Sequence, residues 1–129
     1  MLVADPARLD AATVDGWAAT PYHLLVDLVA DVVARSSIAI DRMAQWVGSS
    51  DEWIGRCGWA VMARLAQHQA DIADAAFTPY LSVIERRIHD APNRAKQGMS
   101  SALIAIGGRS AELAGPAIAA AQRIGPIEI

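Results

Sequence analysis

The chain has 129 residues, of which 53% are hydrophobic and 19% charged. This length suffices for one modest domain with a buried core and excludes two. The formal net charge of −3 argues against a nucleic-acid binder, unless the ten arginines and one lysine gather on one side of the molecule. The single cysteine, Cys57, excludes an internal disulfide and a cysteine-cluster metal site.

Neither a membrane span nor a secretory signal is visible in the sequence. No apolar run reaches the ~18 residues that a bilayer-spanning helix needs. The segment from Met1 to Pro6 lacks a basic start followed by a long apolar stretch. The sequence therefore predicts a cytoplasmic protein with no membrane partner.

Capping residues and prolines divide the first half of the chain into helical segments. These boundary signals are Asp5-Pro6, Asp10, Thr20-Pro21, Ser36-Ser37 and the turn from Gly48 to Asp51. Between them, apolar residues recur three and four positions apart, which is the spacing of a helix. We predict four helices here, running through Trp17, over Leu24 to Val33, over Ile38 to Val47, and over Trp53 to Leu65.

The second half of the chain follows a polar stretch from Gln67 to Asp74 and shows the same helical spacing. Pro79 fits near the start of a helix, where its missing N–H costs little. Three more helices are predicted, one over Phe77 to Ile88, one through Met99 to Ile106 that Gly107-Gly108 closes, and one from the Ser110 cap to Gly125-Pro126. No segment alternates with period two, so the predicted fold is all-α with about seven helices.

An internal repeat sharpens this prediction. The stretch from Val47 to Leu65 can be laid on Ile88 to Ile106 with an offset of 41 residues, so that Trp53 meets Arg94. A period of roughly 40–47 residues with two helices is typical of HEAT and armadillo arrays. The prediction is an α-α superhelix of stacked HEAT-like hairpins, forming one domain over residues 1–129, with a concave side open to a ligand. A plain helical bundle is the alternative.

One carboxylate lies inside an apolar helical run. Asp27 falls within Leu24 to Val33, and a buried carboxylate is costly unless paired, so it lies at a solvent edge or is kept for a task. His23 lies four residues before it, which is a possible metal-ligand spacing. A credible metal site needs three or four ligands, however, and His68 and His89 have no partner at such a spacing. No metal site is predicted.

Glycines and tryptophans mark places where helices pack closely. Gly55 and Gly58 surround Arg56 and would let either another helix or a ligand approach. Cys57 is best interpreted as a small core residue. The four tryptophans favour core or inter-repeat packing over base stacking, and they are Trp17, Trp46, Trp53 and Trp59.

The densest basic cluster is Arg86-Arg87 with His89, Arg94 and Lys96. It suits either a duplex phosphate backbone or a solvated helix end. The sequence shows no phosphate-binding glycine loop and no nucleophile with a base at recognisable spacing. The residues alone therefore favour a scaffold or binding module over an enzyme.

Several segments, taken as a set, resemble the HEAT-like DNA alkylation repair proteins of the AlkD type. The segment from Trp46 to Arg56 resembles the family's pattern of two tryptophans followed by Leu or Ile, any residue and Arg. The similarity continues through Tyr80 to Ile106, and in Ser101 to Gly107 and Ala119 to Gly125. The resemblance implies glycosylases that remove positively charged alkylated purines from duplex DNA in a concave groove, without a metal or cofactor.

The resemblance also implies site residues. His23 to Asp27 resembles the family's W-D-x-V-D, with His23 in place of the tryptophan and Asp27 at the catalytic aspartate, which stabilises the oxocarbenium-like sugar. Arg56 matches a groove arginine, and the second groove tryptophan falls at about Ser101. The implied catalytic residue is Asp27, and His23, Arg56 and Ser101 are the implied substrate contacts.

Two functions follow as hypotheses. The first is a repair-like protein that binds duplex DNA in a basic groove, with the DNA backbone on Arg86, Arg87, Arg94 and Lys96, and that excises alkylated purines. It predicts that Arg56, Arg94, Lys96 and Asp27 share one concave face. The alternative is a non-catalytic scaffold for protein partners. The chain resembles the C-terminal half of the family's array, which suggests a fragment or truncated relative whose exposed repeat ends form homo-oligomers.

Overall fold

The computed structural model describes residues 10–18 and 23–128, and the side chains of residues 23–27 lie outside that description. The described residues form α-helices and one short 3-10 helix, with no strand, which confirms the predicted all-α fold. The elements are α1 (Ala11–Ala18), α2 (His23–Ala34), α3 (Ala39–Val47), α4 (Glu52–His68), η2 (Asp74–Ala76), α5 (Thr78–Arg87), α6 (Asn93–Arg109) and α7 (Ala111–Ile124). None of these helices is long and apolar enough to cross a membrane.

Several predicted helix starts are confirmed by their caps. Asp10 Oδ1 accepts a hydrogen bond from the Thr13 amide at 2.8 Å at the start of α1. Asp51 Oδ1 accepts from the amides of Trp53 and Ile54 at the start of α4. Such caps satisfy N–H groups that the first helical turn leaves unpaired. The predicted boundaries at Asp5-Pro6 and Thr20-Pro21 lie outside the described residues.

Two predicted boundaries need correction. Ser36 donates to the Val33 carbonyl and so closes α2, but α3 begins after Ile38 without a side-chain cap. Gly107-Gly108 does not end α6, which continues to Arg109. A β-carbon on Gly107 would lie 3.0 Å from the Ala117 β-carbon, so this glycine serves the close approach of α6 and α7 rather than a helix end.

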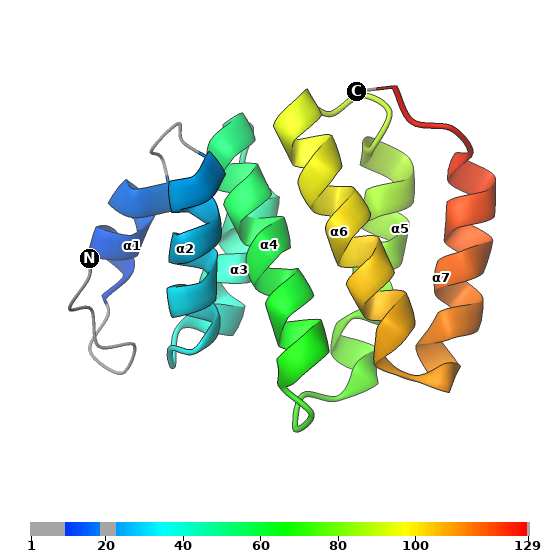
Figure 1. Ribbon diagram of the computed structural model, residues 1–129, viewed down its shortest axis with the longest axis horizontal. Helices are drawn as coiled ribbons and strands as arrows, with labels where there is room; N and C mark the ends of the chain where they lie inside the picture. The colour runs from blue at the N-terminus through cyan, green and yellow to red at the C-terminus, as the bar shows by residue number, and fades with distance from the viewer. Residues whose placement is uncertain (1–9, 19–22, 129) are drawn as a thin grey trace.

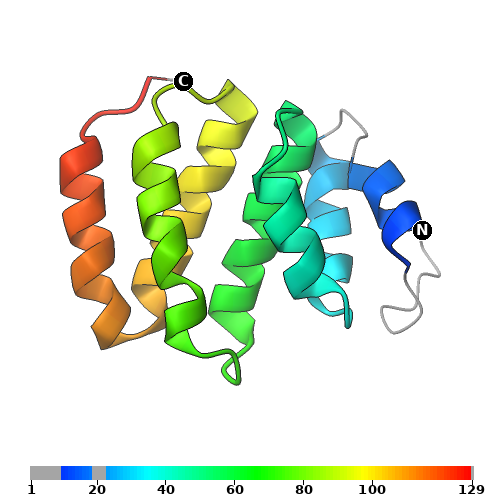
Figure 2. The same cartoon turned by 180° about the vertical axis from the view of Figure 1, so that it is seen from behind.

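The helices form two layers, as the front and back views show (Figure 1, Figure 2). In one layer α2, α4 and α6 lie side by side and run in the same direction; α3 and α5 lie in the other layer, and α7 packs beside α5 and α6. The hairpins α3–α4 and α5–α6 are successive copies of one unit, and their second helices have 17 residues each. This layered repeat, rather than a plain bundle, is the architecture.

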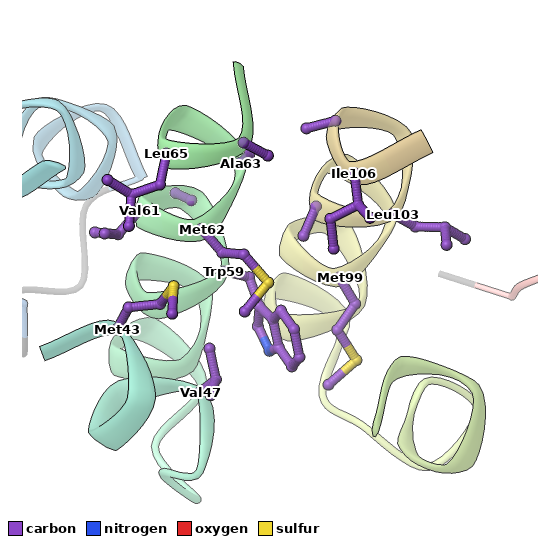
Figure 3. Packing of buried hydrophobic residues seen from close by; sticks show 14 of the residues in the cluster. Met43, Val47, Trp59, Val61, Met62, Ala63, Leu65, Met99, Leu103 and Ile106 are labelled. Atoms are coloured by element: carbon purple, nitrogen blue, oxygen red, sulfur yellow. The ribbon is translucent and has the colours of Figure 1, made fainter. Parts of the chain in front are cut away.

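The core runs through the repeats without a break. Trp59 of α4 is fully buried, and Figure 3 shows it with Met62 facing Met99 of α6. The Trp59 ring packs edge-on against the ring of Tyr80 of α5, with the two ring centroids 6.2 Å apart. The predicted packing role is confirmed for Trp46 and Trp59, which are buried, while Trp17 and Trp53 are half-buried against the core. Cys57 is a buried core residue, as predicted.

A close contact between α3 and α4 explains one of the glycines around Arg56. A β-carbon on Gly58 would lie 2.7 Å from the Val47 nitrogen and 2.8 Å from the Trp46 β-carbon. The prediction that small residues let another helix approach is therefore confirmed for Gly58. At Gly55 an added β-carbon would meet its neighbours at ordinary distances.

An arginine from α6 closes the end of α4. Arg109, whose side chain is 7% exposed, donates to the carbonyls of Leu65, Ala66 and Gln69. It also donates to the Ile72 carbonyl and pairs with Asp74 at 2.8 Å. The bond to Ala66 satisfies a carbonyl that the last turn of α4 leaves without a backbone partner, whereas the Leu65 carbonyl also accepts from the Gln69 amide. Hydrogen bonds from Ser110 and Arg109 lower the pKa of Asp74.

Candidate nucleic-acid interface

A hollow of about 170 Å³ lies between α4 and α6. Its polar lining residues come from corresponding turns of two successive repeats. We call this surface the α4–α6 face, and its polar residues are Arg56, Arg64, Arg94, Gln97 and Ser101. The remaining lining residues are small, so the guanidinium groups dominate the chemistry of the hollow.

Gln97 joins two of these arginines. Its Oε1 accepts a hydrogen bond from Arg56 Nη1 at 2.8 Å and another from Arg94 Nη1 at 3.2 Å. An amide oxygen holds two cations near each other without neutralising either of them. Among the described residues, Arg94 forms no ion pair with a carboxylate. Two positive charges are thus fixed at the edge of the hollow.

Arg94 also lies against an aromatic ring. Its guanidinium carbon is 5.4 Å from the centroid of the Trp53 ring, which is within the range of a cation–π contact. The Arg94 amide donates to Glu52 Oε2 at 3.2 Å, which ties the start of α6 to the start of α4. The 41-residue offset that paired Trp53 with Arg94 in the sequence thus corresponds to a contact.

A carboxylate of α2, that of Asp31, contacts the arginine Arg64 that lines the hollow. Asp31 pairs with Arg64 of α4 at 3.7 Å and with Arg35 of α2 at 3.2 Å. Asp27 lies one turn before Asp31 in α2, and Arg64 lies on the hollow. The side chains of Asp27 and His23 are outside the described residues, so their predicted roles remain predictions.

Of the other predicted substrate contacts, Arg56 and Ser101 are brought together as lining residues of the same hollow. Ser101 is exposed there, at the position where the family resemblance placed a tryptophan. Gln97 and Arg64 were not predicted. The 41-residue repeat offset pairs Arg56 with Gln97, so this offset could have predicted Gln97 as a site residue.

The four predicted backbone contacts do not form one cluster. Arg86 and Arg87 are in α5, in the opposite layer, and line a cavity of about 280 Å³ between the α3–α4 and α5–α6 turns. There Arg87 Nη1 donates to the Val47 carbonyl at 2.8 Å. Lys96 of α6 donates to the Glu128 carbonyl at 2.7 Å. Only Arg94 is joined to Arg56, and the contacts of all four with DNA remain predictions.

The described part of the chain contains no group of three or more His, Cys, Asp or Glu side chains that could hold a metal ion. The polar side chains that line the hollow carry guanidinium, amide and hydroxyl groups. Such groups bind phosphates and the edges and faces of bases. The two-layer helical repeat with this arginine-lined hollow places the chain among the α-helical repeat proteins.

Comparison with known proteins gives the family. A model of the DNA alkylation repair enzyme family matches residues 9–126, which is nearly the whole chain. The chain belongs to this family. A comparison with curated protein sequences gives no match.

A solved structure supports the same assignment. It is described as a new family of proteins related to the HEAT-like repeat DNA glycosylases with affinity for branched DNA structures. It superposes with a TM-score of 0.93 at 26% sequence identity, over 99% of this chain and 56% of that chain. The predicted HEAT-like fold and family resemblance are therefore confirmed, and this chain spans about half the length of that relative.

Proposed function

We propose that this chain binds DNA through the α4–α6 face. The observation that carries the proposal is the pair of arginines, Arg56 and Arg94, that Gln97 holds at the edge of the hollow. The family assignment supports DNA as the ligand. Guanidinium groups suit DNA because they remain charged and bind phosphate oxygens through several donors.

The formal charge of −3 does not oppose this proposal, because DNA binding depends on the local field. At the α4–α6 face Arg64 pairs with Asp31, which it shares with Arg35, and the Arg94 amide donates to the Glu52 carboxylate. The three guanidinium groups of Arg56, Arg64 and Arg94 outnumber these two carboxylates. The face therefore carries more positive than negative charge among the described side chains. This local excess of positive charge supports the proposal despite the acidic total.

The related solved structure belongs to proteins with affinity for branched DNA. We extend this preference to our chain and propose that it binds a branched DNA more tightly than a linear duplex. An open hollow between two helices suits a nucleotide that is displaced from the helical stack, as happens at a branch point. Displacing a nucleotide costs least where its base is already unpaired.

Excision of alkylated purines is the finer part of the proposal, and it depends on Asp27. A carboxylate near the hollow would stabilise the positive charge that develops on the sugar as the base departs. Support for this role comes from the family motif and from the position of Asp27 one turn before Asp31 in α2. We place Arg56 at the phosphate beside the departing base.

The test measures the binding of a linear duplex, and of a branched DNA of equal length, at increasing salt. The proposal expects affinity that falls as salt rises, with tighter binding of the branched DNA. Binding that does not depend on salt, or no binding, contradicts it.

Excision is tested separately as release of bases from alkylated duplex. We expect release by the wild-type chain that Asp27→Asn abolishes and that the matched variant Asp71→Asn, at an exposed residue, retains. Salt-dependent binding without any release contradicts the excision part alone.

A further inference from the structure

Arg94 is held in an unusual way for a residue that would contact a phosphate. Its guanidinium carbon lies over the Trp53 ring, 5.4 Å from the ring centroid, within the range of a cation–π contact. One of its terminal nitrogens, Nη1, is already engaged with Gln97 at 3.2 Å. The side chain is half-buried, so it is fixed by its neighbours and still reachable from solvent.

These contacts fix a flat group from two directions. The Trp53 ring supports the guanidinium from one side, and Gln97 restrains it at one edge. Trp53 itself is half-buried against the core, so the support is firm. A guanidinium is a planar cationic group, and nucleic-acid bases stack on such groups as well as on aromatic rings.

We propose that Arg94, supported by Trp53, is a stacking platform for an unpaired base at the branch point of a DNA. This inference rests on the proposed DNA-binding function and specifies which part of the DNA reaches this end of the face. Under this proposal Arg94 contacts a base of the DNA and not a phosphate of its backbone. Arg56 is left to bind the phosphate of the same strand.

The residues of the proposed phosphate and base contacts are neighbours on the α4–α6 face. Trp53 precedes Arg56 by three residues in α4, which is about 4.5 Å along the helix axis. Gln97 contacts both Arg56 and Arg94, so the proposed phosphate and base contacts are adjacent. A duplex keeps its bases stacked inside and cannot use the platform, whereas a branched DNA with unpaired bases can. The platform thus supplies a physical cause for a preference between the two.

The decisive variant is Arg94→Lys, which keeps the positive charge and removes the planar surface. We measure the affinities of wild type and variant for a linear duplex and for a three-way junction with unpaired bases at its centre. Base stacking contributes enough that its loss is expected to lower junction affinity about tenfold. Duplex affinity is expected to change less than about twofold, because the charge remains. The matched control is Arg123→Lys on the exposed side of α7, away from the α4–α6 face, which is expected to leave both affinities unchanged.

A spectroscopic measurement separates stacking from general support of the fold. We place the fluorescent base 2-aminopurine at an unpaired position of the junction, where its emission reports the stacking of that base. Saturating wild-type protein is expected to change this emission, and Arg94→Lys at saturation is expected to lose that change. Unchanged emission with wild type, or full junction affinity of Arg94→Lys, overturns the stacking platform alone. Absence of salt-dependent binding by wild type to either DNA overturns the proposed function, and the platform with it.

Discussion

Arg56 and Gln97 lie 41 residues apart in the chain, and their side chains meet across α4 and α6 through a hydrogen bond of 2.8 Å. The first residues of the two helices, Glu52 and Asn93, are separated by the same offset. Because the helices run in the same direction, equivalent positions of successive repeats come side by side (Figure 1). The candidate interface is therefore a product of the repeat itself: one repeat supplies the arginine and the next supplies the amide that orients it.

Gln97→Glu tests whether the two arginines act as a cationic pair. A carboxylate at this position would neutralise part of their charge and occupy their donors. We expect DNA affinity to fall, and the slope of log affinity against log salt to become shallower by about 0.9, because the face would neutralise one phosphate fewer. Gln122→Glu on exposed α7 makes the same change of charge and should leave the slope unaltered. Equal slopes for all three proteins would contradict a role for the pair.

Gly58→Ala should destabilise the fold. The added methyl would lie under 3 Å from the Val47 and Trp46 backbones, which have little freedom to move away. Overpacking of this kind costs about 1–3 kcal/mol. Gly108→Ala provides the contrast, because nothing lies within 4 Å of the new methyl inside α6, and it should stabilise by up to about 1 kcal/mol. Urea unfolding of both variants measures this, and a Gly58→Ala chain as stable as wild type would refute the packing argument.

Arg109→Lys should cost more stability than its conservative nature suggests. A lysine cannot reproduce the fork that donates to Leu65, Ala66 and Gln69 and pairs with Asp74. Without the fork the carbonyls of Ala66 and Ile72 lose their side-chain donor, while those of Leu65 and Gln69 keep a backbone donor. The free energy of unfolding should therefore fall by about 1–3 kcal/mol. Arg123→Ala is the matched control, because its pair with Glu85 is exposed and contributes about 0–1 kcal/mol. Similar losses for the two variants would show that the Arg109 bonds contribute little.

The pH dependence of stability should change in Asp74→Asn. The hydrogen bonds from Ser110 and Arg109 lower the pKa of Asp74 below the ordinary 3.8. A lowered pKa in the folded state stabilises the fold at pH values above the ordinary pKa, and this contribution is lost as the pH falls through the folded value. Thermal unfolding between pH 7 and pH 2 should therefore show a weaker acid dependence for the variant. The same acid dependence in both proteins would contradict the assigned cause.

Most of the fold was predictable from the sequence because its signals are local. The apolar spacing indicated the helices, and Asp51 and Ser110 marked two of their starts. The incorrect end at Gly107 shows the limit of local reasoning. A glycine near the end of an apolar run suggests a helix stop, but the close packing of Ala117 from α7 is what requires it there. Such a contact is tertiary and leaves no mark in local spacing.

The site was less predictable than the fold. Arg56 and Ser101 came from the family motif and do share a hollow. Arg86 and Arg87 were grouped with Arg94 because they are near in sequence, yet the turn between α5 and α6 sends them to the opposite layer. Clusters in sequence and clusters on a face differ wherever a turn intervenes. The repeat offset is the better guide, because it brings Gln97 to Arg56.

The measurement that tests the central claim most directly compares the salt dependence of DNA binding for Arg56→Ala and Arg123→Ala. Each variant removes one arginine, the first from the α4–α6 face and the second from the exposed side of α7. If the α4–α6 face binds DNA, Arg56→Ala weakens binding and lowers the slope of log affinity against log salt by about 1, while Arg123→Ala matches wild type. Equal effects of the two variants, or an effect of Arg123→Ala alone, would contradict DNA binding at this face.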